Sequence, residues 1–248
     1  MVKGVLLAGG TGSRLFPLTR ITNKHLLPIG DRPLVSYGIE ALVLGGVTEL
    51  MVVTGGMHAG EFLRLLSNGE EFGLDRLSYA YQERPGGIAE ALGLSERFVG
   101  DDRVVVMLAD NIFERSIKPS LDRFVASDGE ARLLLAQIED VEHLRHLGVP
   151  EIGSDGRIVR IIEKPADPPS NYCVTGVYLY PPDVFQILPT LEPSGRGELE
   201  ITDVNNHYVS AGTMAYDVIE GYWGDAGESI DAYYAVNDQV RRHGANRP

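Results

Sequence analysis

The chain has 248 residues, of which 44% are hydrophobic and 23% are charged, and its formal net charge at pH 7 is −13. This length suits one large α/β domain with a proper core. The acidic balance argues against a general nucleic-acid or anionic-membrane surface, so a polyanionic ligand would need a local cluster of Lys and Arg. The single cysteine, Cys173, excludes an intrachain disulfide and fits a reducing compartment.

The start of the chain gives no sign of export. The first apolar run, Val5–Ala8, is too short for the apolar region of a signal peptide, and it ends on glycine. No apolar stretch approaches the length of a membrane span. We therefore expect a cytoplasmic protein that binds neither nucleic acid nor membrane.

Short apolar runs alternate with amphipathic segments along the first half of the chain. The apolar runs predict buried strands at Val5–Ala8, Leu50–Thr54, Leu77–Tyr81 and Val104–Ala109. The segments between them have the apolar spacing of helices over Leu34–Leu44, Ala59–Leu66 and Ile88–Phe98. This alternation is typical of βαβ units around a mainly parallel sheet.

The second half of the chain is more mixed. Its predicted strands are Leu133–Ile138, Arg157–Ile162 and Val174–Tyr180, and its predicted helices are Pro182–Leu188, Leu199–Ala211 and Ser229–Arg242. The proline-rich segment Lys164–Ser170 is a loop too short to link domains, and residues 243–248 are expected to fray. We predict one α/β domain over residues 1–248, with a mainly parallel mixed sheet flanked by helices.

A glycine-rich turn follows the first predicted strand, where residues 7–14 read LAGGTGSR. Such a turn lets backbone N–H groups approach a phosphate closely. The P-loop signature is absent because no Lys-Ser or Lys-Thr follows the glycines, and Leu15 stands where a dinucleotide site needs its third glycine. The second strand also ends on Thr54 without the acidic residue of that site. A P-loop and an NAD site are both disfavoured.

Two basic residues follow these glycines. Arg14 is adjacent to them and Lys24 comes ten residues later. Either residue alone would be read as a solvated surface charge. Together with a glycine turn at the carboxyl end of a strand, where open α/β sheets bind their ligands, they predict a clamp for a triphosphate.

Further motifs extend this pattern over almost the whole chain. They are residues 9–19 (GGTGSRLFPLT), 23–28 (NKHLLP), 85–91 (PGGIAEA) after Gln82, 110–111 (DN), 163–165 (EKP), 171–176 (NYCVTG), 196–203 (RGELEITD) and 223–227 (WGDAG). In this order they resemble the sugar-1-phosphate nucleotidylyltransferases, and within that family the group that joins dTTP to glucose 1-phosphate. The resemblance implies a Rossmann-like nucleotidyltransferase fold, with a nucleotide-binding half at about 1–115, a sugar-binding half at about 116–230 and a C-terminal helix at about 229–242.

The reaction implied by the resemblance joins two anions. An oxygen of the sugar phosphate attacks the α-phosphorus of the nucleoside triphosphate, and pyrophosphate leaves from the opposite side. Because no protein nucleophile is needed, catalysis consists of positioning and charge neutralisation. The resemblance assigns the departing pyrophosphate to Arg14, the phosphates near the reacting centre to Lys24, and the sugar phosphate to Lys164.

The resemblance also implies that Mg²⁺ is the cofactor, held by Asp110 and Asp225. Two hard carboxylates together with phosphate oxygens suit this ion. Taken singly, Asp110 would equally well cap the following segment and Asp225 would equally well stabilise a turn. Taken together within the resemblance, metal ligation is the favoured interpretation.

The resemblance further implies separate residues for the nucleotide and the sugar. The amide of Gln82 can pair with both the N3–H donor and the O4 acceptor of thymine or uracil. The nucleotide-binding residues that the resemblance implies are Leu7, Gly9, Gly10, Gly12, Ser13, Gln82 and Gly87. Those implied for the sugar are Gly148, Glu163 and Val174.

Other conspicuous residues are not assigned to the site. His143 and His146 have helical spacing but no third ligand nearby, so a metal site there is disfavoured. Cys173 is read as a small buried apolar residue. The acidic residues Glu198, Glu200 and Asp203 are expected to begin a helix and to support the site from outside it. The aromatic residues read as core or subunit contacts are Tyr178, Tyr180, Phe185, Tyr233 and Tyr234.

The sequence departs from the family pattern at two places. Leu147 precedes Gly148 where relatives often have Tyr or Phe, which leaves the identity of the sugar open. The chain also stops soon after the predicted helix Ser229–Arg242, whereas longer relatives continue into a helical extension associated with feedback binding. We therefore expect that regulation to be missing or altered.

Two rival functions stay open at this point. One is an enzyme that uses UTP or another sugar 1-phosphate. The other is a non-catalytic regulatory subunit that binds nucleotide sugars, and the intact set of Arg14, Lys24, Asp110, Lys164 and Asp225 speaks against it. The family also implies a homo-oligomer, possibly a tetramer.

Overall fold

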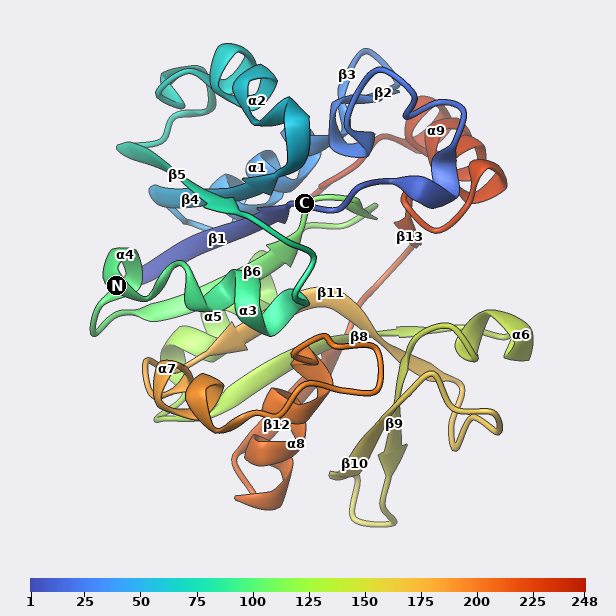
Figure 1. Cartoon of the computed structure of the whole chain (residues 1–248). Helices are drawn as coiled ribbons and strands as arrows, with labels where there is room; N and C mark the ends of the chain where they lie inside the picture. Colours follow the sequence, from blue (N-terminus) through green and yellow to red (C-terminus); the bar gives the residue numbers. More distant parts are fainter.

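The computed structural model describes all 248 residues and is built on a seven-stranded sheet with the order β12-β8-β11-β6-β1-β4-β5 (Figure 1). Strand β11 is antiparallel to both of its neighbours, β6 and β8, and the other adjacent strands are parallel. The strands are β1 (Val2–Ala8), β4 (Glu49–Gly55), β5 (Arg76–Gln82), β6 (Arg103–Leu108), β8 (Ala131–Gln137), β11 (Tyr172–Tyr180) and β12 (Met214–Val218). The predicted mainly parallel mixed sheet is therefore confirmed.

Helices cover both faces of this sheet, and each face has its own cluster of buried apolar side chains. One cluster includes residues of α1 (Leu34–Leu44), α2 (Ala59–Leu66) and α5 (Lys118–Ala126). The other includes residues of α3 (Ile88–Gly93), α4 (Glu96–Val99), α7 (Val184–Ile187) and α8 (Ile201–Ser210). Because β1 is covered on both faces, its last five residues are all buried and form the unbroken apolar run of a central parallel strand.

Three small two-stranded sheets stand outside the main one. They pair β2 (Pro28–Ile29) with β3 (Arg32–Pro33), β7 (Asn111–Phe113) with β13 (Trp223–Asp225), and β9 (Gly148–Ile152) with β10 (Ile158–Glu163). Helix α9 (Ile230–His243) packs near β2 and β3, and α6 (Val141–Leu144) lies beside the β9–β10 hairpin (Figure 1). The 3₁₀ turns are η1 (Ser13–Leu15), η2 (Lys24–Leu26), η3 (Gly56–His58), η4 (Glu70–Phe72) and η5 (Leu188–Thr190). No helix is both long enough and apolar enough to cross a bilayer.

The structure corrects two of the expected elements. The single helix predicted over Ile88–Phe98 is two helices, because the chain turns at Ser95, whose hydroxyl donates to the carbonyl of Leu92 at 2.6 Å. The expected fraying of residues 243–248 is wrong, because Asn246 is buried and its side chain donates to the carbonyl of Tyr37 at 3.0 Å. The Asn246 N–H also donates to the carbonyl of Phe113 at 2.8 Å.

Candidate active site

One cleft of about 460 Å³ opens at the carboxyl edge of the parallel strands. The antiparallel direction of β11 brings the first residues of that strand to the same edge. As a result, residues from strand ends and from a strand start share the cleft. All the sequence-predicted site residues line it: Leu7, Gly9, Gly10, Gly12, Ser13, Arg14, Lys24, Gln82, Gly87, Asp110, Gly148, Glu163, Lys164, Val174 and Asp225.

The glycine-rich turn packs closely against the stem of Lys24. A Cβ at Gly10 would lie 3.0 Å from Lys24 Cε, and one at Gly12 would lie 2.9 Å from Lys24 Cβ. Gly12 also has φ +67°, a left-handed conformation that favours glycine. Asn23 donates to the carbonyl of Gly10 at 3.3 Å and so holds the second loop against the first. The glycines therefore let the Lys24 ammonium reach the sheet edge.

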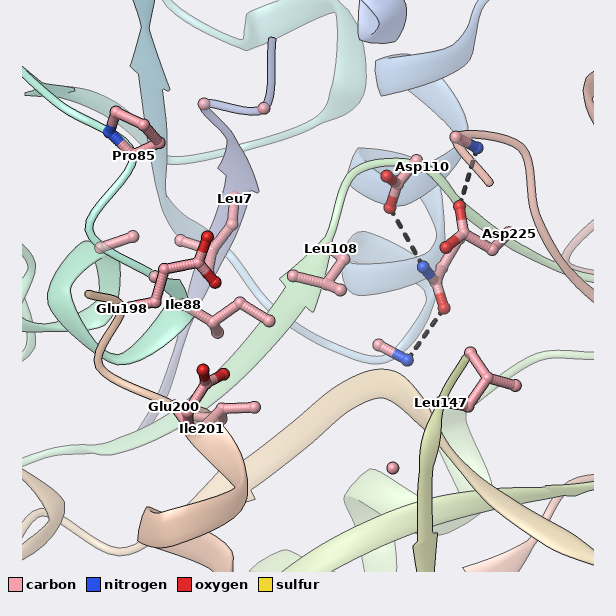
Figure 2. A pocket seen from close by; sticks show the side chains of 18 of the residues that line it. Leu7, Pro85, Ile88, Leu108, Asp110, Leu147, Glu198, Glu200, Ile201 and Asp225 are labelled. Carbon is pink, nitrogen blue, oxygen red and sulfur yellow. Dashed lines mark hydrogen bonds between the residues drawn. The ribbon is translucent and has the colours of Figure 1, made fainter. Parts of the chain in front are cut away.

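Asp110 and Asp225 meet because two short strands pair. Asp110 directly precedes β7, and the β7–β13 pairing sets Asn111 opposite Asp225. The Ala226 N–H then donates to the carbonyl of Asp110 at 2.9 Å. Figure 2 shows the two carboxyl groups on the same side of the pocket, each hydrogen-bonded to a neighbour. Asp225 is the last residue of β13, and its Oδ1 accepts from the Gly227 N–H at 2.7 Å in the turn that follows.

Three charged groups converge on the space that Gly227 leaves open. The point where a Cβ of Gly227 would stand lies 2.6 Å from Asp110 Oδ2, 2.6 Å from Lys24 Nζ and 3.2 Å from Asp225 Oδ1. Lys24 Nζ also donates directly to Asp110 Oδ2. No third Asp, Glu, His or Cys joins the two carboxylates, so further oxygen ligands for a cation would come from phosphate or water.

The two carboxyl groups differ in their electrostatics. Burial would raise the pKa of Asp110, but the adjacent Lys24 ammonium outweighs it and lowers that pKa to about 2. Burial and the nearby charge of Asp110 raise the pKa of Asp225 to about 7. The pKa of Lys24 rises despite its burial, because both carboxylates favour its charged form. One ammonium thus faces two buried carboxyl groups, and a bound hard cation would neutralise the negative charge that remains when both are ionised.

Asn111 holds this arrangement together, and sequence reasoning assigned it no role of its own. Its Oδ1 accepts from the Gly176 N–H at 2.9 Å and from Trp223 Nε1 at 2.7 Å. Its Nδ2 donates to Asp110 Oδ1 at 3.1 Å. The buried amide of Asn111 therefore connects β11 and β13 to the carboxylate of Asp110, a candidate metal ligand. In the sequence, only its position directly after Asp110 pointed to such a role.

Gln82 lies on the nucleotide side of the cleft with one side of its amide already engaged. Its Nε2 donates to the carbonyl of Gly87 at 3.3 Å and to Glu90 Oε1 at 3.2 Å. Its Oε1 lies against Gly9, where a Cβ would stand 3.1 Å from it. The sequence predicted that both the NH₂ group and the oxygen of this amide pair with a base. In the structure only the oxygen, a hydrogen-bond acceptor, is left to face the cleft.

Charged residues gather on the sugar side. Glu163 Oε2 accepts from Thr202 Oγ1 at 2.8 Å, and Lys164 Nζ lies 3.9 Å from Glu163 Oε1. Lys164 itself has φ +47°, a left-handed conformation for a residue with a side chain, and its N–H donates to the carbonyl of Leu147 at 2.9 Å. The aliphatic side chain of Leu147 also lines the cleft.

The acidic segment before α8 lies closer to the site than the sequence suggested. Glu200 directly precedes the first residue of α8, in line with the expected helix start, and Glu198 and Glu200 both line the cleft, where Figure 2 labels their carboxylates. Arg196 Nη2 donates to both carboxylate oxygens of Glu200 at 2.9 Å, and it lies 3.5 Å from Glu163 Oε1. Glu200 thus precedes the helix and holds Arg196, and both Glu198 and Glu200 face the cleft, whereas their expected supporting role stays a prediction.

His143 has a protein partner. Its Nε2 lies 2.9 Å from Glu228 Oε2, and its ring stacks on Trp223. The carboxylate of Glu228 raises the pKa of His143, and His143 in turn lowers the pKa of Glu228. The pair links α6 to the loop that follows Asp225.

Comparison with known proteins places these features in a family. The family model described as nucleotidyl transferase matches residues 3–243. A low-salt glycan biosynthesis nucleotidyltransferase, Agl11 of Haloferax volcanii, is 38% identical over 93% of this chain, which spans 64% of that longer protein. A glucose-1-phosphate thymidylyltransferase of an Actinoplanes species is 40% identical over 97% of this chain and 78% of its own length.

Solved structures give the same result for the fold. A crystal structure from Bacillus anthracis, of a protein proposed to be a glucose-1-phosphate thymidylyltransferase and solved with sucrose, superimposes with a TM-score of 0.91 at 44% identity. The superposition covers 97% of this chain and 96% of the Bacillus anthracis chain. A UDP-glucose pyrophosphorylase in complex with UDP-glucose has a TM-score of 0.82 at 24% identity over 98% of this chain and 99% of its own, a likeness in fold alone. The chain therefore belongs to the nucleotidyl transferase family.

Proposed function

We propose that this chain transfers a thymidylyl group from dTTP to glucose 1-phosphate, giving dTDP-glucose and pyrophosphate. The observation that carries the proposal is the convergence of Asp110, Asp225 and Lys24 beside Gly227, in the cleft that also holds the glycine-rich turn and Lys164. Relatives from several bacteria that align over most of this chain are named glucose-1-phosphate thymidylyltransferase, which supports this choice of substrates.

The chemical difficulty of the proposed step is charge. A phosphate oxygen of glucose 1-phosphate attacks the α-phosphorus of dTTP, a new phosphorus–oxygen bond forms, and the bond to the leaving pyrophosphate breaks. Both reactants are anions, so cations in the cleft must hold them together in line. We assign Arg14 and Lys24 to the triphosphate and Lys164 to the phosphate of the sugar.

The donor set of the site fits Mg²⁺. Two carboxylates with the glycine-lined space between them supply hard oxygen ligands, and they leave coordination positions for phosphate oxygens. Bound there, Mg²⁺ would neutralise charge on the reacting phosphates. Lys24 would then bind phosphate while remaining close to Asp110, and Asn111 would keep Asp110 oriented.

The remaining contacts are assigned to the two substrates. The backbone at Leu7, Gly9, Gly10, Gly12, Ser13 and Gly87 would hold the nucleotide, and Gln82 would contact its base. Glu163 would accept hydrogen bonds from sugar hydroxyls, and Gly148 and Val174 would contribute backbone groups. Leu147 gives this sugar pocket an aliphatic wall. Assembly as a homo-oligomer and a cytoplasmic location belong to the same proposal.

A pyrophosphate-release assay tests the function directly. Purified protein with Mg²⁺ is offered dTTP, UTP and dCTP, each with glucose 1-phosphate and with other hexose 1-phosphates. We expect the highest kcat/KM for dTTP with glucose 1-phosphate. Preference for UTP or another sugar would favour the first rival, and binding of dTDP-glucose without any release of pyrophosphate would favour the regulatory subunit.

A further inference from the structure

Glu90 lies behind the base-contacting candidate Gln82 and does not line the cleft itself. It belongs to the first turn of α3, and its Oε1 accepts from Gln82 Nε2 at 3.2 Å. The same Nε2 donates to the carbonyl of Gly87 at 3.3 Å. The two N–H bonds of one amide group therefore have two acceptors, both supplied by the protein.

The chemistry of these partners fixes which way the amide of Gln82 faces. A carboxylate and a backbone carbonyl only accept hydrogen bonds, so each needs the NH₂ end of the amide. The reversed orientation would set the amide oxygen against two acceptors and leave it without a donor. Gln82 Oε1 must then point away from Glu90, and it lies against Gly9 at the cleft, where it accepts no hydrogen bond from the protein.

The local backbone is shaped to admit the carboxylate of Glu90. A Cβ at Gly86 would lie 2.1 Å from Glu90 Cδ, so only glycine leaves room for this carboxylate. The second carboxylate oxygen lies 3.5 Å from Arg84 Nη2. Gly87 has φ +99°, and a Cβ there would lie 2.4 Å from the carbonyl oxygen of Leu199. Both glycines therefore serve to place the two acceptors that hold Gln82.

A fixed acceptor at this position discriminates between pyrimidines of equal size. Thymine and uracil carry an N3–H donor, whereas the N3 of cytosine is an acceptor. A buried acceptor that meets another acceptor loses its hydrogen bond and remains desolvated. We propose that Glu90 is a specificity-determining positioning residue, which locks the Gln82 amide so that the cleft accepts thymine or uracil and rejects cytosine. This inference rests on the proposed nucleotide site.

Isothermal titration calorimetry with Mg²⁺ tests the inference without relying on turnover. Dissociation constants for dTTP and dCTP are measured for the wild type, Glu90→Ala, the isosteric Glu90→Gln and Gly86→Ala, whose methyl group would displace the carboxylate. Glu83→Gln is the matched control, because it removes a charge next to Gln82 from an exposed residue that is neither of the two acceptors of the amide. Circular dichroism confirms that each variant is folded.

We expect the wild type to prefer dTTP and Glu83→Gln to keep that preference. The ratio of the two dissociation constants should fall about tenfold in Glu90→Ala and in Gly86→Ala, with a smaller fall in Glu90→Gln. An equal loss of affinity for both nucleotides, or a ratio within about twofold of wild type, would overturn the inference and leave the proposed function in place. Failure of the wild type to bind either nucleotide would overturn both.

Discussion

Asp110 and Asp225 both lie near the one ammonium of Lys24, and their pKa values are shifted in opposite directions. Because the pKa of Asp110 is lowered, its ionised form stabilises the fold, and this contribution is lost as pH falls toward about 2. Because the pKa of Asp225 is raised from 3.8 to about 7, its protonated form favours the fold, and this contribution is lost as pH rises from about 4 to about 7. Loss of the two carboxylates should therefore change stability in opposite directions and activity in the same direction.

We predict that Asp110→Asn and Asp225→Asn each lower kcat at least about a hundredfold, because each removes a cation ligand and its charge. Without divalent cation at about pH 8, Asp110→Asn should unfold at lower urea concentration than wild type, and Asp225→Asn at an equal or higher one. Turnover assays and urea titrations measure the two effects. Activity near wild type in either variant would remove that residue from the proposed cation site.

The two lysines of the cleft are expected to serve different substrates. Lys24 stands among the residues after β1, and Lys164 stands beside Glu163 on the sugar side. A charge-assisted hydrogen bond to phosphate contributes about 1.5–3 kcal/mol, so losing one should weaken binding roughly ten- to a hundredfold. We predict that Lys164→Ala weakens the binding of glucose 1-phosphate and leaves the binding of dTTP unchanged, and that Lys24→Ala weakens the binding of dTTP. Calorimetry with each substrate separately checks this, and the reverse pattern would contradict our division of the site.

At the scale of elements, the site depends on the short β7–β13 ladder and on the buried amide of Asn111 that joins it to β11. We predict that Asn111→Ala lowers the free energy of unfolding by about 2–4 kcal/mol, since it leaves the Gly176 N–H and Trp223 Nε1 buried without an acceptor. Urea denaturation followed by Trp223 fluorescence measures it. An exposed substitution such as Asn68→Ala serves as the control and should change stability far less.

The same ladder shows what sequence patterns can and cannot predict. The strands β1, β4 and β6 and the helices α1 and α2 were predictable because each carries a long apolar run or several turns of helical spacing. Strand β13 has three residues, too few to show any period. The local sequence of a strand does not determine which other strand it pairs with. The pairing of Asp225 with Asn111 could therefore not be predicted from residue spacing.

Motif residues were predictable for a different reason. The residues of the glycine-rich turn and Lys24 lie close together in the chain, and a turn at the carboxyl end of a strand limits where they can go. Glu90 and Arg196 lie within two of the motifs, but their roles could not be predicted, because each role depends on which side chain the residue meets after folding. The buried Asn246 was misjudged for the same reason: a polar residue near the end of a sequence gives no sign of the carbonyl it will bind.

Across the whole molecule, the His143–Glu228 pair connects the β8–β9 region with the segment that carries Asp225. The raised pKa of His143 means that its contribution is present below its ordinary value of 6.5 and is lost as pH rises through the higher folded value. Glu228, whose pKa is lowered, contributes above its ordinary value of 4.5. The pair is therefore most stabilising between these limits.

We predict that His143→Gln destabilises the protein by up to about 1 kcal/mol at about pH 6, and by less at about pH 9. Urea titrations of the variant and the wild type at both pH values give the difference in the free energy of unfolding. Glu228→Gln should reproduce it, and the double variant should add little more, because both changes remove one interaction. A difference from wild type that does not depend on pH would mean that the ion pair contributes nothing measurable.

The left-handed backbone at Lys164 has a consequence for how this protein would respond to directed evolution. A lysine in that conformation costs the fold roughly 1–2 kcal/mol, whereas Asn adopts it more readily. We predict that Lys164→Asn raises the free energy of unfolding by about 0.5–1 kcal/mol and, like Lys164→Ala, lowers kcat/KM for glucose 1-phosphate roughly ten- to a hundredfold, which thermal melts and the pyrophosphate assay would show together. A library selected only for heat resistance would therefore enrich enzymes with weaker sugar-phosphate binding at this position, whereas one selected for activity would retain the strained lysine.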